Sequence, residues 1–75
     1  MKQERYKVDK NKDLIDRWAE IKTPEQFRTI MFAMIEKYET RLGKKDSVVS
    51  EVTKMADYME RWRQYEVNLA KQEEQ

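Results

Sequence analysis

The chain has 75 residues, with 16 Lys and Arg against 15 Asp and Glu, a formal net charge of +1, and neither cysteine nor histidine. This composition excludes disulfides, zinc sites of the Cys/His kind and His-based nucleophilic catalysis. The near-neutral charge argues against binding to duplex DNA or to an anionic membrane through bulk electrostatics. A domain this short buries only about 60% of its unfolded surface, so oligomerisation is the remaining way to enlarge its core.

The first residues lack the apolar core of a signal peptide, and the sequence contains no run of about 18 apolar residues. We therefore expect a cytoplasmic protein without a membrane partner. No linker or internal repeat divides the chain, which predicts a single domain over residues 1–75. The polar ends, residues 1–8 and 71–75, are expected to fray and to leave an ordered core over about residues 9–70.

A short amphipathic helix is expected from Asn11 to Ile21, because apolar residues recur there at helical spacing. These residues are Leu14, Ile15, Trp18 and Ile21. This segment is the first of three expected helices.

The second expected helix covers roughly residues 24–42. Thr23 can cap it, Pro24 suits the first helical position, and Gln26 can close a capping box. Gly43, the one glycine of the chain, supplies a left-handed C-terminal stop. The apolar face of this helix comprises Phe27, Ile30, Met31, Met34, Ile35, Tyr38 and Leu42.

The third expected helix begins after Asp46 or Ser47 and runs to about residue 70. It is longer than the second helix, so its end is expected to overhang its partner. Its apolar residues recur at near-heptad spacing, and they are Val48, Val52, Met55, Met59, Trp62 and Leu69. The overhang is expected to carry Trp62, Tyr65 and Leu69.

These elements predict an all-α fold, in which a short N-terminal helix precedes a hairpin of two longer amphipathic helices. Phe32 lies off the apolar face of the second helix, and Tyr58 and Tyr65 form a second stripe on the third. Wide apolar faces on a small chain favour a homo-oligomer, for which C2 symmetry is the commonest arrangement. The expected oligomer or partner surface consists of Phe32, Trp62, Tyr65 and Leu69.

Cations gather where the second and third helices join. Lys37 and Arg41 share a face of the second helix. An antiparallel hairpin can bring that face against one on the third helix, which carries Lys54, Tyr58, Arg61 and Tyr65. Arg and Lys suit phosphate contacts, and a tyrosine ring suits base stacking. The candidate phosphate or nucleotide site consists of Lys37, Arg41, Lys44, Lys45, Lys54, Tyr58 and Arg61.

A structural interpretation of the same charges is also open. Acids and bases of the third helix are spaced three or four residues apart, so they can pair along one solvated face. The pairs are Glu51 with Lys54, Lys54 with Asp57, and Asp57 with Arg61. The two lysines after Gly43 can likewise serve as a solubilising turn.

The sequence contains only parts of known nucleotide-binding and metal-binding motifs. The turn at Gly43 follows a helix and lacks the earlier glycine of a P-loop. The carboxylates of Glu36 and Glu39 suit the magnesium site of all-helical nucleotide pyrophosphohydrolases, but Lys54 stands where the partner motif needs an acid. The third helix mixes acids with its bases, which argues against a helix that reads DNA. A bound Mg²⁺ is expected only with a nucleotide, and only if the helices align Glu36, Glu39, Glu51 and Asp57.

A characteristic order of residues spans most of the chain. It reads Lys37-Tyr38, Arg41, Gly43-Lys44-Lys45-Asp46, then Glu51-Val52-Thr53-Lys54, Tyr58 and Arg61, and it follows Asp13-Leu14-Ile15-Asp16 and Thr23-Pro24-Glu25-Gln26-Phe27. Over about residues 6–63 this order resembles the SaV-like family of short phage-encoded proteins, commonly described as of unknown role. A longer relative is described as a nucleotide kinase without a P-loop. The resemblance implies a phage origin, a place in the host cell cytosol, and nucleotide or phosphate contact at the signature cations.

Two functions from different classes follow. The first is a small helical oligomer that binds a nucleotide or other phosphorylated small molecule in a cationic corner between the last two helices, for modification or sequestration. The second is a non-enzymatic module whose apolar surface docks on a host or phage protein. We favour the first, without assigning catalytic residues, since kinase-like activity rests on the resemblance alone.

Overall fold

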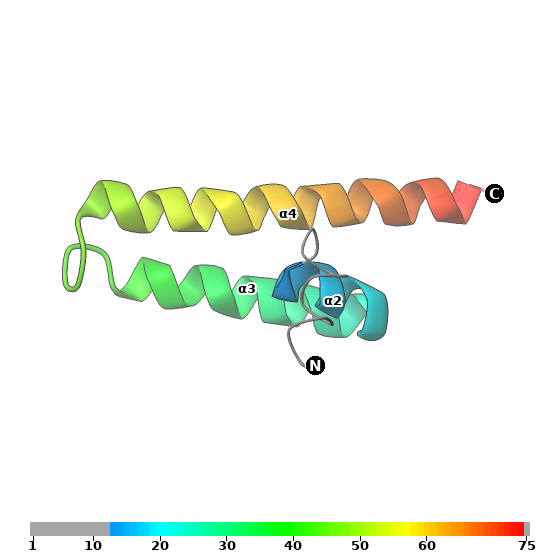
Figure 1. Cartoon of the computed structure of the whole chain (residues 1–75), viewed down its shortest axis with the longest axis horizontal. Coiled ribbons are helices and arrows are strands. Elements are labelled where there is room, and N and C mark those ends of the chain that lie inside the picture. The colour runs from blue at the N-terminus through cyan, green and yellow to red at the C-terminus, as the bar shows by residue number, and fades with distance from the viewer. Residues whose placement is uncertain (1–12, 75) are drawn as a thin grey trace, which may run out of the picture.

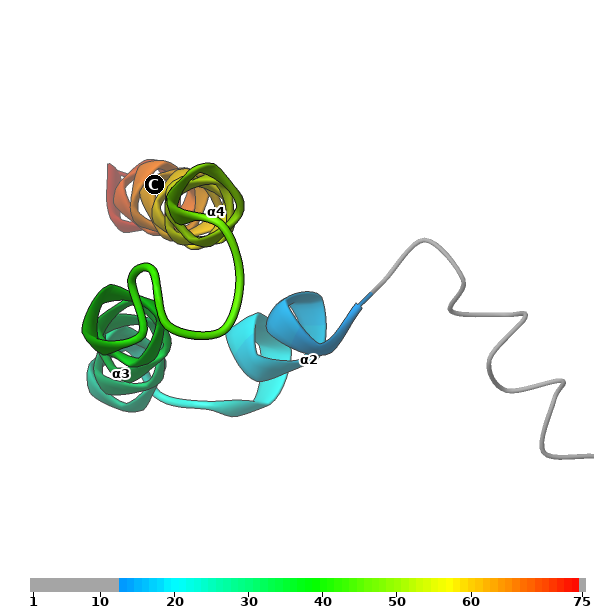
Figure 2. The ribbon, with the colours of Figure 1, turned by 90° about the vertical axis from the view of Figure 1, so that its left-hand side faces the viewer.

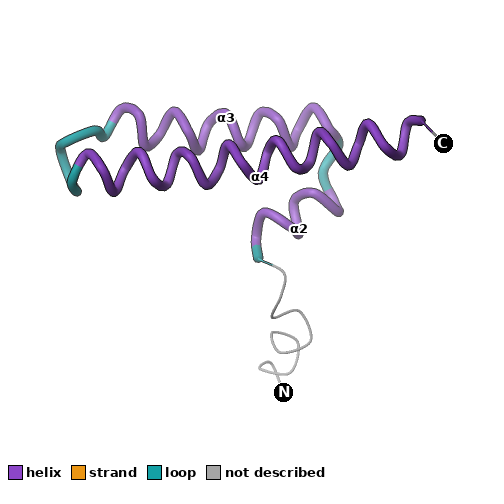
Figure 3. Tube along the Cα trace, turned by 90° about the horizontal axis from the view of Figure 1, so that it is seen from above, coloured by secondary structure: helices purple, strands orange, loops and turns teal. Residues whose placement is uncertain are grey.

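The computed structural model describes residues 13–74, which form three helices and no strand. Helix α2 covers Leu14–Ile21, α3 covers Pro24–Thr40, and α4 covers Val48–Glu74. Helices α3 and α4 run antiparallel and side by side, and α2 lies at an angle to them, close to the start of α3 (Figure 1, Figure 3). The predicted all-α fold, a short helix before a two-helix hairpin, is confirmed. Within the described range, no helix is both long enough and apolar enough to cross a membrane.

Helix α2 begins where two aspartates cap each other. The Asp13 carboxylate accepts a hydrogen bond from the Asp16 backbone N–H at 3.1 Å, and the Asp16 carboxylate accepts one from the Asp13 backbone N–H at 3.1 Å. This capping box satisfies two N–H groups that lack helical partners and sets the first turn at Leu14. The expected helix over residues 11–21 is wrong at Asp13, whose backbone is extended, and residues 11 and 12 lie outside the described residues.

Helix α3 begins as its sequence predicts. The Thr23 hydroxyl accepts from the Gln26 backbone N–H at 3.1 Å, and the Gln26 side-chain oxygen accepts from the Thr23 backbone N–H at 3.0 Å. The helix ends at Thr40 rather than near residue 42, because the backbone at Arg41 already departs from helical geometry. Gly43 then adopts a φ of 75°, a left-handed conformation that a side chain would strain.

Helix α4 is capped by the polar residues that precede it. The Ser47 hydroxyl accepts from the Ser50 backbone N–H at 3.0 Å, and the Asp46 carboxylate accepts from the Ser47 backbone N–H at 2.9 Å. The Asp46 carboxylate also accepts from the Ser50 hydroxyl at 3.0 Å. Both candidate capping residues therefore take part, and the chain turns tightly from α3 into α4.

The end of α4 corrects a prediction. The helix continues to Glu74, so the expected end near residue 70 is wrong, whereas the fraying expected for residues 71–74 stays a prediction. Lys71 in the last turn complements the negative end of the helix dipole. The fraying expected for residues 1–8 and for residue 75 concerns positions outside the described residues.

The interface between α3 and α4 is built on side chains of α4 that are seven residues apart, namely Glu51, Tyr58 and Tyr65. The Tyr65 ring stacks on Phe27 with centroids 3.9 Å apart, and the Tyr58 ring stacks on Tyr38 with centroids 5.8 Å apart. Glu51 lies 3.6 Å from Arg41, measured from Oε2 to Nε. Among the described residues, Phe27 and Met31 are the apolar side chains with no exposed surface. The interface therefore has a small apolar centre and a charged end near the turn.

The face of α4 that meets α3 differs from the predicted apolar stripe. Val48, Val52 and Met59 are exposed, although the heptad spacing placed them in the interface. Tyr65 contacts Phe27, so the expectation that it lies in a free overhang is wrong. A tyrosine buries its ring while its hydroxyl reaches the edge of the interface, which a ranking by hydrophobicity alone does not capture.

One flank of the hairpin is joined by a polar contact. Arg28 donates to both carboxylate oxygens of Glu66, at 2.7 and 2.8 Å, and the Trp62 indole N–H donates to the same carboxylate at 3.0 Å. Trp62 and Leu69 are half-buried, and Trp62 lies beside this contact rather than free. Of the four residues expected to form a partner surface, Phe32 is the one that is exposed, at 58%.

Replacing Phe27 with alanine is expected to destabilise the fold by about 3–5 kcal/mol, because it removes a fully buried ring and its stacking on Tyr65. Thermal unfolding followed by circular dichroism measures the loss. Ile21→Ala, which shortens an exposed side chain in α2, serves as the control and is expected to cost far less. Equal losses in the two variants would contradict the position of Phe27 in the core.

Candidate functional site

Cations surround Tyr38 near the end of α3. The Nζ atoms of Lys37 and Lys54 lie 5.6 and 5.5 Å from the centroid of its ring, and the Cζ atom of Arg41 lies 5.1 Å from it. Each contact is worth roughly 0.5–1 kcal/mol at an exposed site. Lys37 and Arg41 lie on and just after α3, and Lys54 lies on α4, so the antiparallel hairpin brings these predicted cations together. We call Lys37, Tyr38, Arg41 and Lys54 the Tyr38 cluster.

A groove of about 510 Å³ opens beside this cluster and extends along α4 toward α2. Its lining residues are Asp13, Ile15, Tyr38, Lys54, Asp57, Tyr58, Glu60 and Arg61. Burial, together with the neighbouring Tyr38, raises the pKa of Tyr58. The groove therefore combines two tyrosines with charges of both signs.

Glu51 is fully buried next to the Tyr38 cluster. Its closest cation is Arg41, and within the described part of the chain neither its carboxylate oxygens nor the Nε atom of Arg41 has a hydrogen-bond partner. A buried carboxylate is costly unless a charge compensates it. Arg41 thus has two roles, because it compensates Glu51 and also contributes a cation to the Tyr38 cluster.

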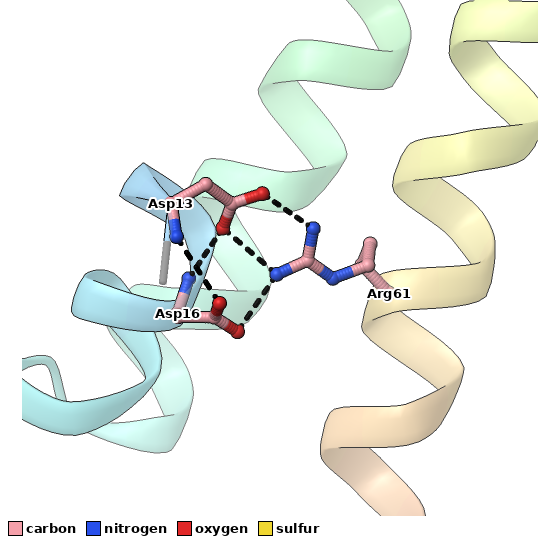
Figure 4. A network of polar contacts seen from close by, with 3 residues as sticks. All are labelled: Asp13, Asp16 and Arg61. Atoms are coloured by element: carbon pink, nitrogen blue, oxygen red, sulfur yellow. Dashed lines mark hydrogen bonds and ion pairs between the residues drawn. The ribbon is translucent and has the colours of Figure 1, made fainter. Parts of the chain in front are cut away.

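Arg61 forms hydrogen bonds with the two aspartates at the start of α2. It donates to both carboxylate oxygens of Asp13, at 2.7 and 2.8 Å, and to Asp16 at 2.8 Å (Figure 4). The hydrogen bonds from Arg61 hold the pKa of Asp13 well below its usual range, and the pKa of Arg61 is raised in return. Arg61 was expected to bind phosphate, but the structure uses its planar fork to fix the start of α2 against α4.

The predicted cations differ in their surroundings. Lys44 and Lys45 are exposed in the turn and do not line the groove. Lys54 pairs with Asp46 at 3.7 Å, both side chains being partly exposed, and Arg61 pairs with α2. The expected ladder of Glu51, Lys54, Asp57 and Arg61 along one helix is therefore replaced by contacts between different segments.

The carboxylates proposed for magnesium do not assemble. Within residues 13–74, no three Asp or Glu side chains come close enough together to hold a metal ion. Glu51 is buried against Arg41, whereas Asp57 lines the groove and Glu36 and Glu39 are exposed on α3. The four carboxylates thus lie in different surroundings rather than at one site.

Comparison with known families places most of the chain in one family. Residues 2–60 match the family described as Protein of unknown function (DUF3310). The chain belongs to the DUF3310 family. The DUF3310 match contains the whole Tyr38 cluster and Glu51, and it ends just before Arg61. No curated protein and no solved structure matches the chain.

Sequence reasoning missed several residues in and beside the site, among them Tyr38, Asp13 and Asp16. Tyr38 was placed in the apolar face of its helix, although its position next to Lys37 and one turn before Arg41 signals a ring among cations. Asp13 and Asp16 were taken as part of a family signature only. Their spacing of three signals a capping box, but nothing local indicates that Arg61, 45 and 48 positions away, would join them.

Acidification is expected to release α2. Because the folded pKa of Asp13 is lowered, its contribution to stability is complete above the unfolded value near pH 4 and is lost as pH falls toward the folded value. Asp13→Asn keeps a good helix cap but removes the charge, so it is expected to cost about 1 kcal/mol at neutral pH. Its thermal midpoint should fall less than that of the native chain when the pH is lowered from neutral to below 4. Identical acid dependence in the two proteins would contradict the Asp13–Arg61 contact.

Removing Arg41 is expected to be costly because it leaves Glu51 buried without a counter-charge. We expect Arg41→Ala to destabilise the chain by about 3 kcal/mol, and Glu51→Gln placed in the same chain to restore part of that loss. A double-mutant cycle by urea unfolding measures the coupling between the two residues. Strictly additive effects would show that the two charges do not interact.

Proposed function

We propose that this chain binds the phosphate group of a nucleotide, or of another phosphorylated small molecule, at the Tyr38 cluster. The observation that carries this proposal is the convergence of Lys37, Arg41 and Lys54 within 5.6 Å of one ring centroid, at the mouth of a groove. Like charges that are brought together repel one another, and a bound dianion relieves that repulsion. An anionic group is therefore the ligand that best complements this corner.

Arginine and lysine contribute to such a site in different ways. The planar guanidinium of Arg41 suits bidentate contact with two phosphate oxygens, whereas the ammonium groups of Lys37 and Lys54 act as mobile point charges. Lys54 is the cation that both belongs to the Tyr38 cluster and lines the groove. It thus connects a phosphate at the cluster with the remainder of a ligand in the groove.

The rest of the groove favours a ligand with hydrogen-bond donors. Asp57 and Glu60 line it beyond Lys54, and a carboxylate accepts hydrogen bonds from sugar hydroxyls or from exocyclic amino groups of a base. The groove volume of about 510 Å³ lies in the range of roughly 300–1,000 Å³ that is typical of small-molecule sites. A mononucleotide, with an anion at one end and donors at the other, satisfies both parts of the groove.

The resemblance to the SaV-like family supports the same choice. Its signature includes the three cations of the cluster, and it implies a phage origin and nucleotide contact. We assign no catalytic residue and infer binding for sequestration in the host cytosol, with modification of the nucleotide as an alternative. Mg²⁺ would then accompany the phosphate as part of the ligand.

Alanine at both Lys37 and Lys54 is expected to weaken nucleotide binding by roughly tenfold for each lost charged contact. Calorimetric titration with mono-, di-, tri- and cyclic nucleotides, with and without Mg²⁺, measures the change. This pair of substitutions leaves Arg41 in place, so the buried Glu51 keeps its counter-charge and the fold is spared. Affinity should also fall as the salt concentration rises.

Lys44→Ala combined with Lys45→Ala provides a control with the same change of charge. These lysines lie outside the groove, so this variant is expected to bind as tightly as the native chain. If only this control loses binding, the phosphate site lies in the turn that carries Lys44 and Lys45 rather than at the Tyr38 cluster. If the folded native chain binds none of the nucleotides, the result would favour the second function, in which the exposed Phe32 face docks on a host or phage protein.

A further inference from the structure

One face of α4 has the sequence of a helix pairing surface but no partner within the described residues. Val48, Val52 and Met59 are 53%, 47% and 50% exposed. Together with Met55 and Trp62 they follow the alternating spacing of four and three residues that is typical of a two-stranded coiled coil. The interface with α3 uses Glu51, Tyr58 and Tyr65 instead, so α4 carries two adjacent pairing faces.

This face lies on the side of the hairpin that α2 leaves open. Viewed along the hairpin, α2 lies on one side of the α3–α4 pair only (Figure 2). Arg61 marks the side of α4 that contacts α2, and Glu66, in contact with Arg28, marks the other side. At 100° per residue, Met59 falls on the Glu66 side of α4, and Phe32, one turn after Arg28, falls on the same side of α3.

We propose that a second copy of this chain covers this face, forming a C2 dimer in which α4 packs against α4 of the partner. Exposed residues that flank the stripe on α4 include Val49, which is apolar and 76% exposed, and Ala56, whose small side chain allows two helices to approach closely. The chain alone buries two apolar side chains completely among its described residues, which is little for an independent core. A symmetric contact between identical stripes enlarges that core without any other partner.

The charges near the stripe select an antiparallel pair. In a parallel pair in register, each residue beside the contact lies next to its own copy, so Arg63 would meet Arg63 and Glu66 would meet Glu66. An antiparallel pair centred near Ala56 separates these like charges and brings Val52 of one copy opposite Met59 of the other. The nucleotide groove lies on the α2 side and stays open in this dimer, so the two proposals are independent.

Sedimentation equilibrium of the native chain tests the proposal. We expect a mass of twice 9.3 kDa at micromolar concentration, and a return to 9.3 kDa when Val52 and Met59 are both replaced by lysine. Gln64→Lys combined with Asn68→Lys adds the same charge to exposed positions on the other side of α4 and is expected to remain dimeric. A monomeric native chain, or a dimer that survives the Val52 and Met59 substitutions, would overturn the proposal.

A crosslinking experiment avoids any dependence on folding of the lysine variants. The chain has no cysteine, so a single Ala56→Cys or Arg63→Cys substitution reports on one position only. An antiparallel pair predicts a disulfide-linked dimer on mild oxidation for Ala56→Cys and none for Arg63→Cys. Efficient crosslinking of both variants would indicate a parallel pair, and crosslinking of neither would contradict contact through this face.

Discussion

The register of α4 against α3 is the constraint on which the rest of the structure depends. It is set by contacts at both ends of the interface, where Tyr65 stacks on Phe27 and Glu51 lies against Arg41. Between them the register places Lys54 beside Tyr38, although the two residues belong to different helices. A slip by one helical turn would separate the cations of the Tyr38 cluster and would leave the buried Glu51 without a counter-charge.

The same few charges therefore serve the structure and make up the proposed ligand site. Arg61 is committed to α2, and Arg41 is divided between Glu51 and the Tyr38 ring, whereas Lys37 is exposed and Lys54 has a weak, partly exposed partner in Asp46. The cations differ in how readily a ligand can recruit them. The lysines are the most available, because an exposed ion pair contributes little to stability and exchanges easily with another anion.

Much of the fold could be predicted from local chemistry. The caps at Thr23 and Ser47, the proline at the start of α3 and the glycine after its end set the helix boundaries to within a few residues. The face of α4 could not be predicted, because valine and methionine are more often fully buried than tyrosine and glutamate. The approach of Lys37, Arg41 and Lys54 could be predicted from the antiparallel hairpin and helical spacing, but Lys44, Lys45 and Arg61 do not join them. The Asp13–Arg61 contact joins distant segments and leaves no local signal.

The attachment of α2 has a consequence for the groove. None of the residues of α2 is fully buried, and its start is held to α4 by the side chains of Asp13 and Asp16 on Arg61. A helix attached in this way opens far more often than the hairpin does, so its amide hydrogens should exchange with solvent first. Since Asp13 and Ile15 form part of the groove wall, each opening of α2 also dismantles that wall. A ligand that occupies the groove would slow this exchange, and the tighter it binds, the more it would slow it. Amide exchange in α2 would therefore report whether the groove is occupied, although α2 contributes no residue to the Tyr38 cluster.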